Sequence, residues 1–82
     1  MQPKYTPSEA DLKKLANNFT YHPPQPDQLP RYEEIRAKGK EMAEFLTATC
    51  PASRELSLAI TNLEQTIFWA NAAIARNEVK NE

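Results

Sequence analysis

Two ring side chains, Tyr21 and His22, stand directly before a pair of prolines in the sequence YHPPQPDQLP. Proline restricts the backbone, so a ring held beside it loses little conformational entropy when it stacks on a flat ligand. Stacking on a nucleobase is one interaction that such rings provide. The alternative is that Phe19 and Tyr21 are packing anchors that pin this segment to the rest of the fold.

Cations in two places could bind an anion. Arg36 and Lys40 are four residues apart on one helix face, with Lys38 nearby, so their charges repel unless an anion joins them. Solvated charges that alternate with glutamates are the alternative. Arg76 ends a line of small residues, and an oligomer that buries this line would gather several guanidinium groups, which need anionic partners. The alternative for Arg76 is a favourable interaction with its own helix C-terminus.

Rings and guanidinium groups together suit a flat, polyanionic ligand, and nucleotides have this chemistry. Catalysis has less support, because His22 is the only histidine and Cys50 the only cysteine. The sequence also lacks a phosphate-binding loop, a dinucleotide-binding fingerprint, a nucleophile elbow and a zinc-protease motif. We therefore expect a binding protein that is not an enzyme and that needs no metal or cofactor.

The charge balance argues against one class of partner. Lys and Arg total 10 and Asp and Glu total 11, and a net charge of -1 does not suit a duplex nucleic-acid binder with a basic face. No apolar run approaches the roughly 20 residues of a membrane span, and the first residues lack the apolar stretch of a signal peptide. We expect residues 1–82 to form a single cytosolic domain.

Weak strand signals and seven prolines, confined to residues 3–51, predict an all-α fold with proline-marked breaks. The sequence Thr6-Pro7-Ser8-Glu9 is typical of a capping box with Thr6 as the N-cap, so residues 1–18 should form an arm that contains a short helix. Prolines exclude regular helix from residues 19–30 and predict an extended strap there.

Two long helices are expected next, over residues 31–49 and 53–77, followed by a tail at 78–82. Pro51 stops the first helix and Ser53 is a good N-cap for the second, and so short a connection makes the helices antiparallel neighbours. Gly39 lies in the inner stripe of the first helix, where glycine costs about 1 kcal/mol relative to alanine. A close approach by the other helix would offset this cost.

The second long helix is apolar on nearly all sides. Its inner stripe faces the first helix, two further lines of residues include Phe68 and Trp69, and only one residue per heptad is consistently polar. Because the first helix can cover only one stripe, we expect other copies of the chain to cover the rest. The alternative is that the strap and the N-terminal helix of the same chain cover it.

Four segments carry a family resemblance: YHPP at residues 21–24, SRE at 53–55, TNLE at 61–64 and WANAAIAR at 69–76. With them, the sequence from about Phe19 to Glu78 closely resembles the small bacteriophage proteins that defeat cyclic-oligonucleotide signalling. These proteins are the anti-CBASS cyclic-nucleotide sponges, whose helical hairpin is shared with the Thoeris anti-defence sponge.

The resemblance implies a homohexamer in the cytoplasm of the infected bacterial host. It would sequester cyclic dinucleotides of the cGAMP type between protomers, and cyclic trinucleotides near a three-fold axis, without cleaving them. The resemblance also implies that Tyr21, with His22 beside it, stacks on a base and that Arg76 contacts phosphate. Arg36 is the match for a phosphate-binding residue of the first long helix, with Lys38 or Lys40 as alternatives. A structural or adaptor oligomer that binds a protein partner is the competing function.

Overall fold

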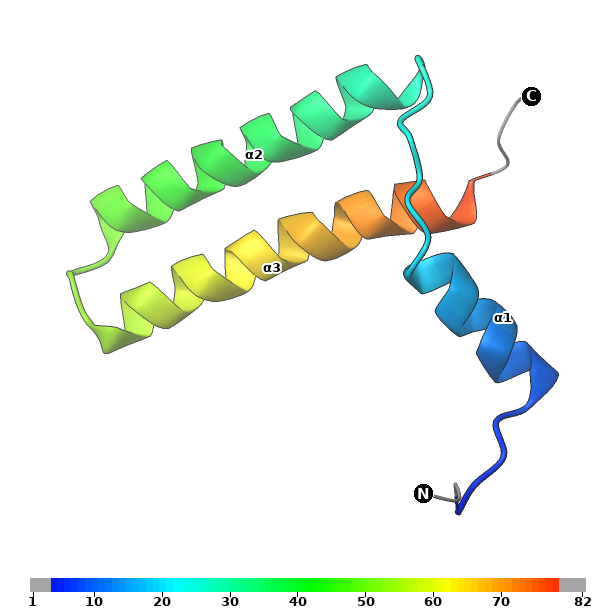
Figure 1. Ribbon diagram of the computed structural model, residues 1–82. Coiled ribbons are helices and arrows are strands. Elements are labelled where there is room, and N and C mark those ends of the chain that lie inside the picture. Colours follow the sequence, from blue (N-terminus) through cyan, green and yellow to red (C-terminus); the bar gives the residue numbers. More distant parts are fainter. Residues whose placement is uncertain (1–3, 79–82) are drawn as a thin grey trace.

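Two long antiparallel helices form the body of the molecule (Figure 1). The computed structural model describes residues 4–78. Over that range it contains three α-helices, α1 (Glu9–Asn18), α2 (Gln28–Thr49) and α3 (Arg54–Asn77), and no strand. The all-α class and the helical hairpin are therefore confirmed. The predicted tail lies, apart from Glu78, outside the described residues, as do residues 1–3 of the predicted arm.

The short helix α1 begins two residues later than the capping pattern suggested. Ser8, not Thr6, is the N-cap: its side chain accepts a hydrogen bond from the Asp11 backbone N–H at 3.0 Å, and the Asp11 carboxylate accepts one from the Ser8 N–H at 3.4 Å. The box is thus formed by Ser8 and Asp11 instead of Thr6 and Glu9. Serine is a stronger N-cap residue than threonine, which favours the second of the two overlapping patterns.

Helix α2 begins at Gln28, three residues before the predicted start at Arg31. Pro30 therefore lies inside the first helical turn. A proline is tolerated there because the backbone N–H groups of the first turn have no intrahelical acceptor. The α1–α2 connection, residues 19–27, contains the remaining prolines of the predicted strap and has no regular secondary structure.

The turn between α2 and α3 forms as predicted. The Ser53 hydroxyl accepts a hydrogen bond from the Leu56 backbone N–H at 3.1 Å, which caps α3. Gly39 is buried against α3, and a Cβ atom built on it would lie 2.7 Å from Cδ1 and 2.8 Å from Cγ1 of Ile67. The close approach inferred from this glycine is confirmed.

The molecule is thin, with extents of 51 × 38 × 15 Å. Its short dimension is little more than the roughly 10–12 Å diameter of one helix, so most of the hairpin is a single layer. Among the described residues no apolar side chain is fully buried, and Phe68 and Trp69 of α3 stay 68% and 65% exposed. No helix of this part is long and apolar enough to cross a membrane.

Helix α1 does not cover the hairpin. It projects away from the C-terminal end of α3, and the connection then crosses that end on its way to α2 (Figure 1). One hydrogen bond, from Asn17 Nδ2 to the Arg76 carbonyl oxygen at 2.9 Å, joins α1 to α3. Cover of α3 by its own chain, the alternative to self-association, is therefore only partial: Ala72, Ala75 and Arg76 beside the connection and α1 are half-buried, whereas Phe68 and Trp69 stay exposed.

Candidate ligand-binding site

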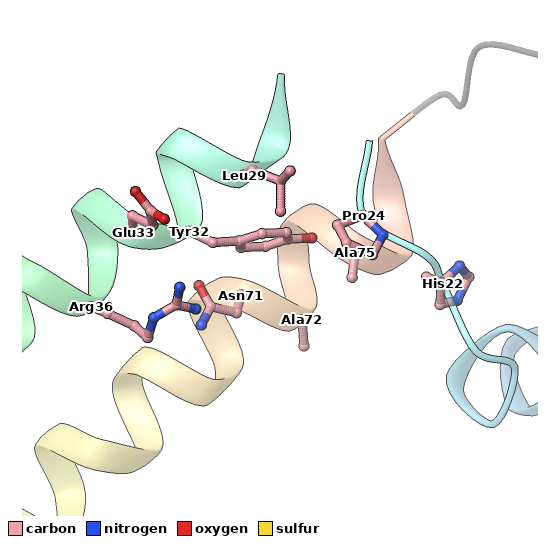
Figure 2. Close-up of a pocket in the computed structure, with 9 residues that line it drawn as sticks. All are labelled: His22, Pro24, Leu29, Tyr32, Glu33, Arg36, Asn71, Ala72 and Ala75. Carbon is pink, nitrogen blue, oxygen red and sulfur yellow. The ribbon is translucent and has the colours of Figure 1, made fainter. Parts of the chain in front are cut away.

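A groove with a cavity volume of about 410 Å³ lies between the start of α2 and the end of α3 (Figure 2). We call it the Tyr32 groove. Three segments line it: the α1–α2 connection, the first turns of α2 and the last turns of α3. The lining residues are His22, Pro24, Leu29, Tyr32, Glu33, Arg36, Asn71, Ala72 and Ala75.

The polar side chains of the Tyr32 groove are two rings, Tyr32 and His22, one cation, Arg36, one carboxylate, Glu33, and one amide, Asn71. The Tyr32 ring is half-buried and lies across the space between α2 and α3, and the exposed Arg36 side chain extends from α2 toward Asn71 (Figure 2). Among the described residues, the buried Oδ1 atom of Asn71 has no hydrogen-bond partner. An unsatisfied buried acceptor is unfavourable in the free protein. Small alanines on α3 leave room beside it.

His22 lies at the edge of the groove and has a structural contact. Its Nε2 is 2.8 Å from the carbonyl oxygen of Asn17, the second-last residue of α1, so the ring ties the connection to α1. Tyr21 does not line the Tyr32 groove and is 80% exposed. Phe19 is 87% exposed. The alternative in which Phe19 and Tyr21 anchor the connection to the hairpin is therefore wrong, and His22 ties the connection to α1.

The three cations predicted on α2 fall in different places. Arg36 lines the Tyr32 groove, and it also borders a more apolar groove of about 410 Å³ together with Lys40 and Gly39. Lys38 is exposed and lines neither. Of these three cations, Arg36 is the one that lines both grooves, so its side chain could contact a ligand in either.

Arg76 lies in the last turn of α3, away from the Tyr32 groove. Its guanidinium carbon is 5.8 Å from the centroid of the Trp69 ring, which is the geometry of a cation–π contact. It lines a groove of about 380 Å³ between α1 and α3, which we call the Trp69 groove. The other lining residues are Lys14, Asn17, Asn18, Trp69, Ala72, Ala73 and Asn77. Two cations, an indole and several amides thus face one space.

A polar cluster that the sequence did not reveal closes the end of the hairpin beside the Tyr32 groove. Arg31 donates hydrogen bonds from Nη1 and Nη2 to the two carboxylate oxygens of Glu78, each at 2.7 Å, and Gln28 Nε2 donates to Glu78 Oε1 at 3.0 Å. These bonds, those from Arg31 first, lower the pKa of Glu78 from 4.5 to about 2. The hydrogen bond and the charge of Glu78 raise the pKa of Arg31. We call Gln28, Arg31 and Glu78 the Glu78 cluster.

Tyr32 and Asn71 were also missed as candidate site residues. Tyr32 lies seven residues before Gly39 and so shares the inner stripe of α2, where spacing predicts a packing ring; its hydroxyl near the start of the helix is the signal that could have identified it. Asn71 is one of the residues of α3 that are polar once per heptad, and such residues ordinarily face solvent. In the part of the chain that the structure covers, no group of three His, Cys, Asp or Glu side chains could hold a metal ion.

The comparisons with known proteins agree with this architecture. The family model of the Acb2/Tad1 hairpin domain matches residues 11–75, which is most of the chain. No curated protein and no solved structure matches it. This is a family of sponge-type binding proteins, not known as enzymes, and it suggests an anti-defence role that involves cyclic nucleotides. The match includes α2, the turn and nearly all of α3, so the chain belongs to the Acb2/Tad1 hairpin family of anti-CBASS and anti-Thoeris sponges.

Proposed function

We propose that this protein binds cyclic di- and trinucleotide second messengers in the cytoplasm of a phage-infected bacterium and sequesters them without cleaving them. The observation that carries the proposal is the Tyr32 groove, which is lined by a tyrosine ring, the Arg36 guanidinium and the Asn71 side chain. A nucleotide offers a flat base to the ring, a phosphate to the guanidinium and polar base atoms to the amide.

The uncovered faces of α3 support binding at junctions between protomers. A single chain leaves Phe68 and Trp69 largely exposed, so other copies are needed to cover them. We propose a homohexamer, in which each groove would be completed by a neighbour. Tyr21, which projects from the connection and is 80% exposed, is free to stack on a base held at such a junction. The Trp69 groove with Arg76 suits a second phosphate-bearing ligand.

Sequestration requires tight binding, because the protein must hold its ligand at concentrations that would activate the host effector. A dissociation constant below about 1 μM corresponds to more than about 8 kcal/mol of binding free energy. At a ligand concentration of about 100 times the dissociation constant, mass action stabilises the folded protein by about 2.7 kcal/mol. For a domain of this size that corresponds to a rise in melting temperature of roughly 10–20 °C.

A thermal-shift panel of cyclic di- and trinucleotides tests the proposal. We expect at least one member to raise the melting temperature by this amount, and native mass spectrometry to show intact ligand on an oligomer. Recovery of unmodified ligand after denaturation distinguishes sequestration from cleavage. If no member of the panel shifts the melting temperature, the protein is not a sponge for these messengers.

An adaptor oligomer that binds a protein partner is the second candidate. The exposed apolar side chains Phe45 and Leu58, 60% and 46% exposed, favour it. They lie near the end of α2 and the start of α3, whereas the Tyr32 groove is lined by the start of α2 and the end of α3. The same panel separates the two functions, because an adaptor gives no shift with any cyclic nucleotide.

A further inference from the structure

Gln28 is the one buried polar side chain in the part of the chain that the structure covers, with 3% of its surface exposed. Its two polar atoms join three segments. Oε1 accepts a hydrogen bond from the backbone N–H of Gln25 in the α1–α2 connection at 2.9 Å, and Nε2 donates to Glu78 after α3 at 3.0 Å. A buried amide that satisfies partners on both sides fixes the distance between them.

Arg31 completes the arrangement from one turn further along α2. Its guanidinium group makes a bidentate contact with both carboxylate oxygens of Glu78. Such a contact fixes the orientation of the carboxylate as well as its distance. Arg31 also contacts Asp27 at 3.3 Å, at the N-cap of α2. The side chains of Arg31 and Glu78 are 42% and 34% exposed. The pair is therefore partly shielded from water.

The Glu78 cluster lies among the residues that form the Tyr32 groove. On α2, Gln28 and Arg31 alternate with the lining residues Leu29 and Tyr32. The bond to Gln25 is one residue away from Pro24, and Glu78 is three residues beyond Ala75, which also line the groove. Each bond of the cluster thus ties together two of the three segments from which the groove is built.

We propose that Gln28, Arg31 and Glu78 are positioning residues that hold the three walls of the Tyr32 groove at the spacing required by the ligand. They touch the walls and not the ligand. This inference rests on the proposed function of the groove. Without the cluster, the connection and the start of α2 can move away from α3, while the hairpin contacts at Gly39 and beyond remain.

The expected effect is a loss of affinity without a loss of fold. If the groove keeps its closed spacing for only about one tenth of the time, the apparent dissociation constant rises about tenfold. Gln28→Met keeps the length of the side chain and removes both hydrogen bonds. Glu78→Leu removes the acceptor, whereas Glu78→Gln keeps an amide oxygen for Arg31 and Gln28.

The experiment is calorimetric titration of the full-length protein with cyclic GMP–AMP, beside native mass spectrometry and far-ultraviolet circular dichroism. We expect Gln28→Met and Glu78→Leu to weaken binding about tenfold with unchanged oligomer mass and helical signal. The matched control Glu34→Leu on the exposed side of α2 should bind like the wild type. Glu78→Gln should lie between the wild type and Glu78→Leu, because it keeps one acceptor oxygen but sets an amide NH2 against one N–H donor of Arg31. Partial retention of affinity by glutamine but not by leucine is the result that a packing role would not give.

Two results would overturn the inference. One is wild-type affinity in Gln28→Met, and the other is a parallel loss of helicity and affinity in both Gln28→Met and Glu78→Leu. If Gln28→Met does not fold, Arg31→Lys replaces it, because lysine keeps the charge but cannot bond both carboxylate oxygens; wild-type affinity in Arg31→Lys then overturns the inference. A wild-type protein that binds no cyclic nucleotide contradicts the proposed function instead, so the two failures are distinguishable.

Discussion

Replacement of Gly39 by alanine sets two effects of known size against each other. Alanine is favoured over glycine in a helix interior by about 1 kcal/mol. Against this, the added Cβ would lie 2.7 Å and 2.8 Å from Cδ1 and Cγ1 of Ile67, well inside contact distance. Ile67 cannot move aside at little cost, because relief of the Cγ1 contact requires a change of χ1, and a β-branched residue in a helix has one strongly preferred χ1 rotamer.

Overpacking of this kind destabilises by about 1–3 kcal/mol. The helix preference offsets about 1 kcal/mol of that, so Gly39→Ala should lower the free energy of unfolding by roughly 0–2 kcal/mol. For a domain of this size, 1 kcal/mol corresponds to a change of about 4–8 °C in melting temperature. The assay is thermal unfolding followed by circular dichroism, at one fixed protomer concentration because the melting temperature of an oligomer depends on it.

The Ile67→Ala background makes the test decisive. It removes both atoms that the new methyl group would meet, so there Gly39→Ala should stabilise by about 1 kcal/mol, the helix preference alone. If that background is too unstable to measure, Ile67→Val removes Cδ1 and should reduce the penalty. An equal effect of Gly39→Ala in the wild type and in these backgrounds would refute the reasoning, because the cost would then not come from Ile67.

Three other perturbations test the ion pair, the exposed ring and the uncovered helix face. Because Arg31 lowers the pKa of Glu78 to about 2, their interaction is fully present above pH 4.5 and is lost as the pH falls toward 2. The melting temperature of the wild type should fall more steeply over this range than that of Glu78→Gln, and parallel profiles would contradict the assignment. Tyr21→Ala should weaken cyclic dinucleotide binding by about 5- to 150-fold, from roughly 1–3 kcal/mol of stacking, with unchanged oligomer mass; a lower mass in sedimentation would identify the ring as a packing contact between protomers. Phe68→Ser and Trp69→Ser should each reduce the oligomer to smaller species by native mass spectrometry, and an unchanged mass would show that these faces are not interfaces.

Much of the fold followed from local rules. The Ser53 cap, the stop at Pro51 and the close approach at Gly39 each depend on one residue type at one place, so a single sequence was enough to predict them. The two errors, at the starts of α1 and α2, also have local causes. Overlapping capping patterns competed at Ser8, and Pro30 was read as a helix breaker although a first turn accepts proline.

The candidate site was less predictable, because its main features join residues far apart in the sequence. The bonds from Arg31 and Gln28 to Glu78 link positions 47 and 50 residues apart, and no periodicity within one helix indicates such a pairing. The spacing of Tyr32 fits a packing stripe as well as it fits a binding site. Its ring lines a groove because it lies near the open end of the hairpin. Arg36 was predicted from its charge and helix face, and the structure brings it beside Tyr32 and Asn71.

The thinness of the hairpin connects stability, assembly and binding. A chain in which none of the described apolar side chains is fully buried gains little stability from its own contacts, so most of the apolar area that it can still remove from water lies on Phe68, Trp69 and similar exposed residues. Covering that area with other copies would bring the open grooves beside the new interfaces. A ligand bound there would then add its binding energy to assembly and folding together.

The melting temperature should therefore rise with protomer concentration, and this dependence should weaken when a cyclic nucleotide saturates the protein. A melting temperature independent of protomer concentration would show that the single hairpin is stable by itself, and the coupling would not exist.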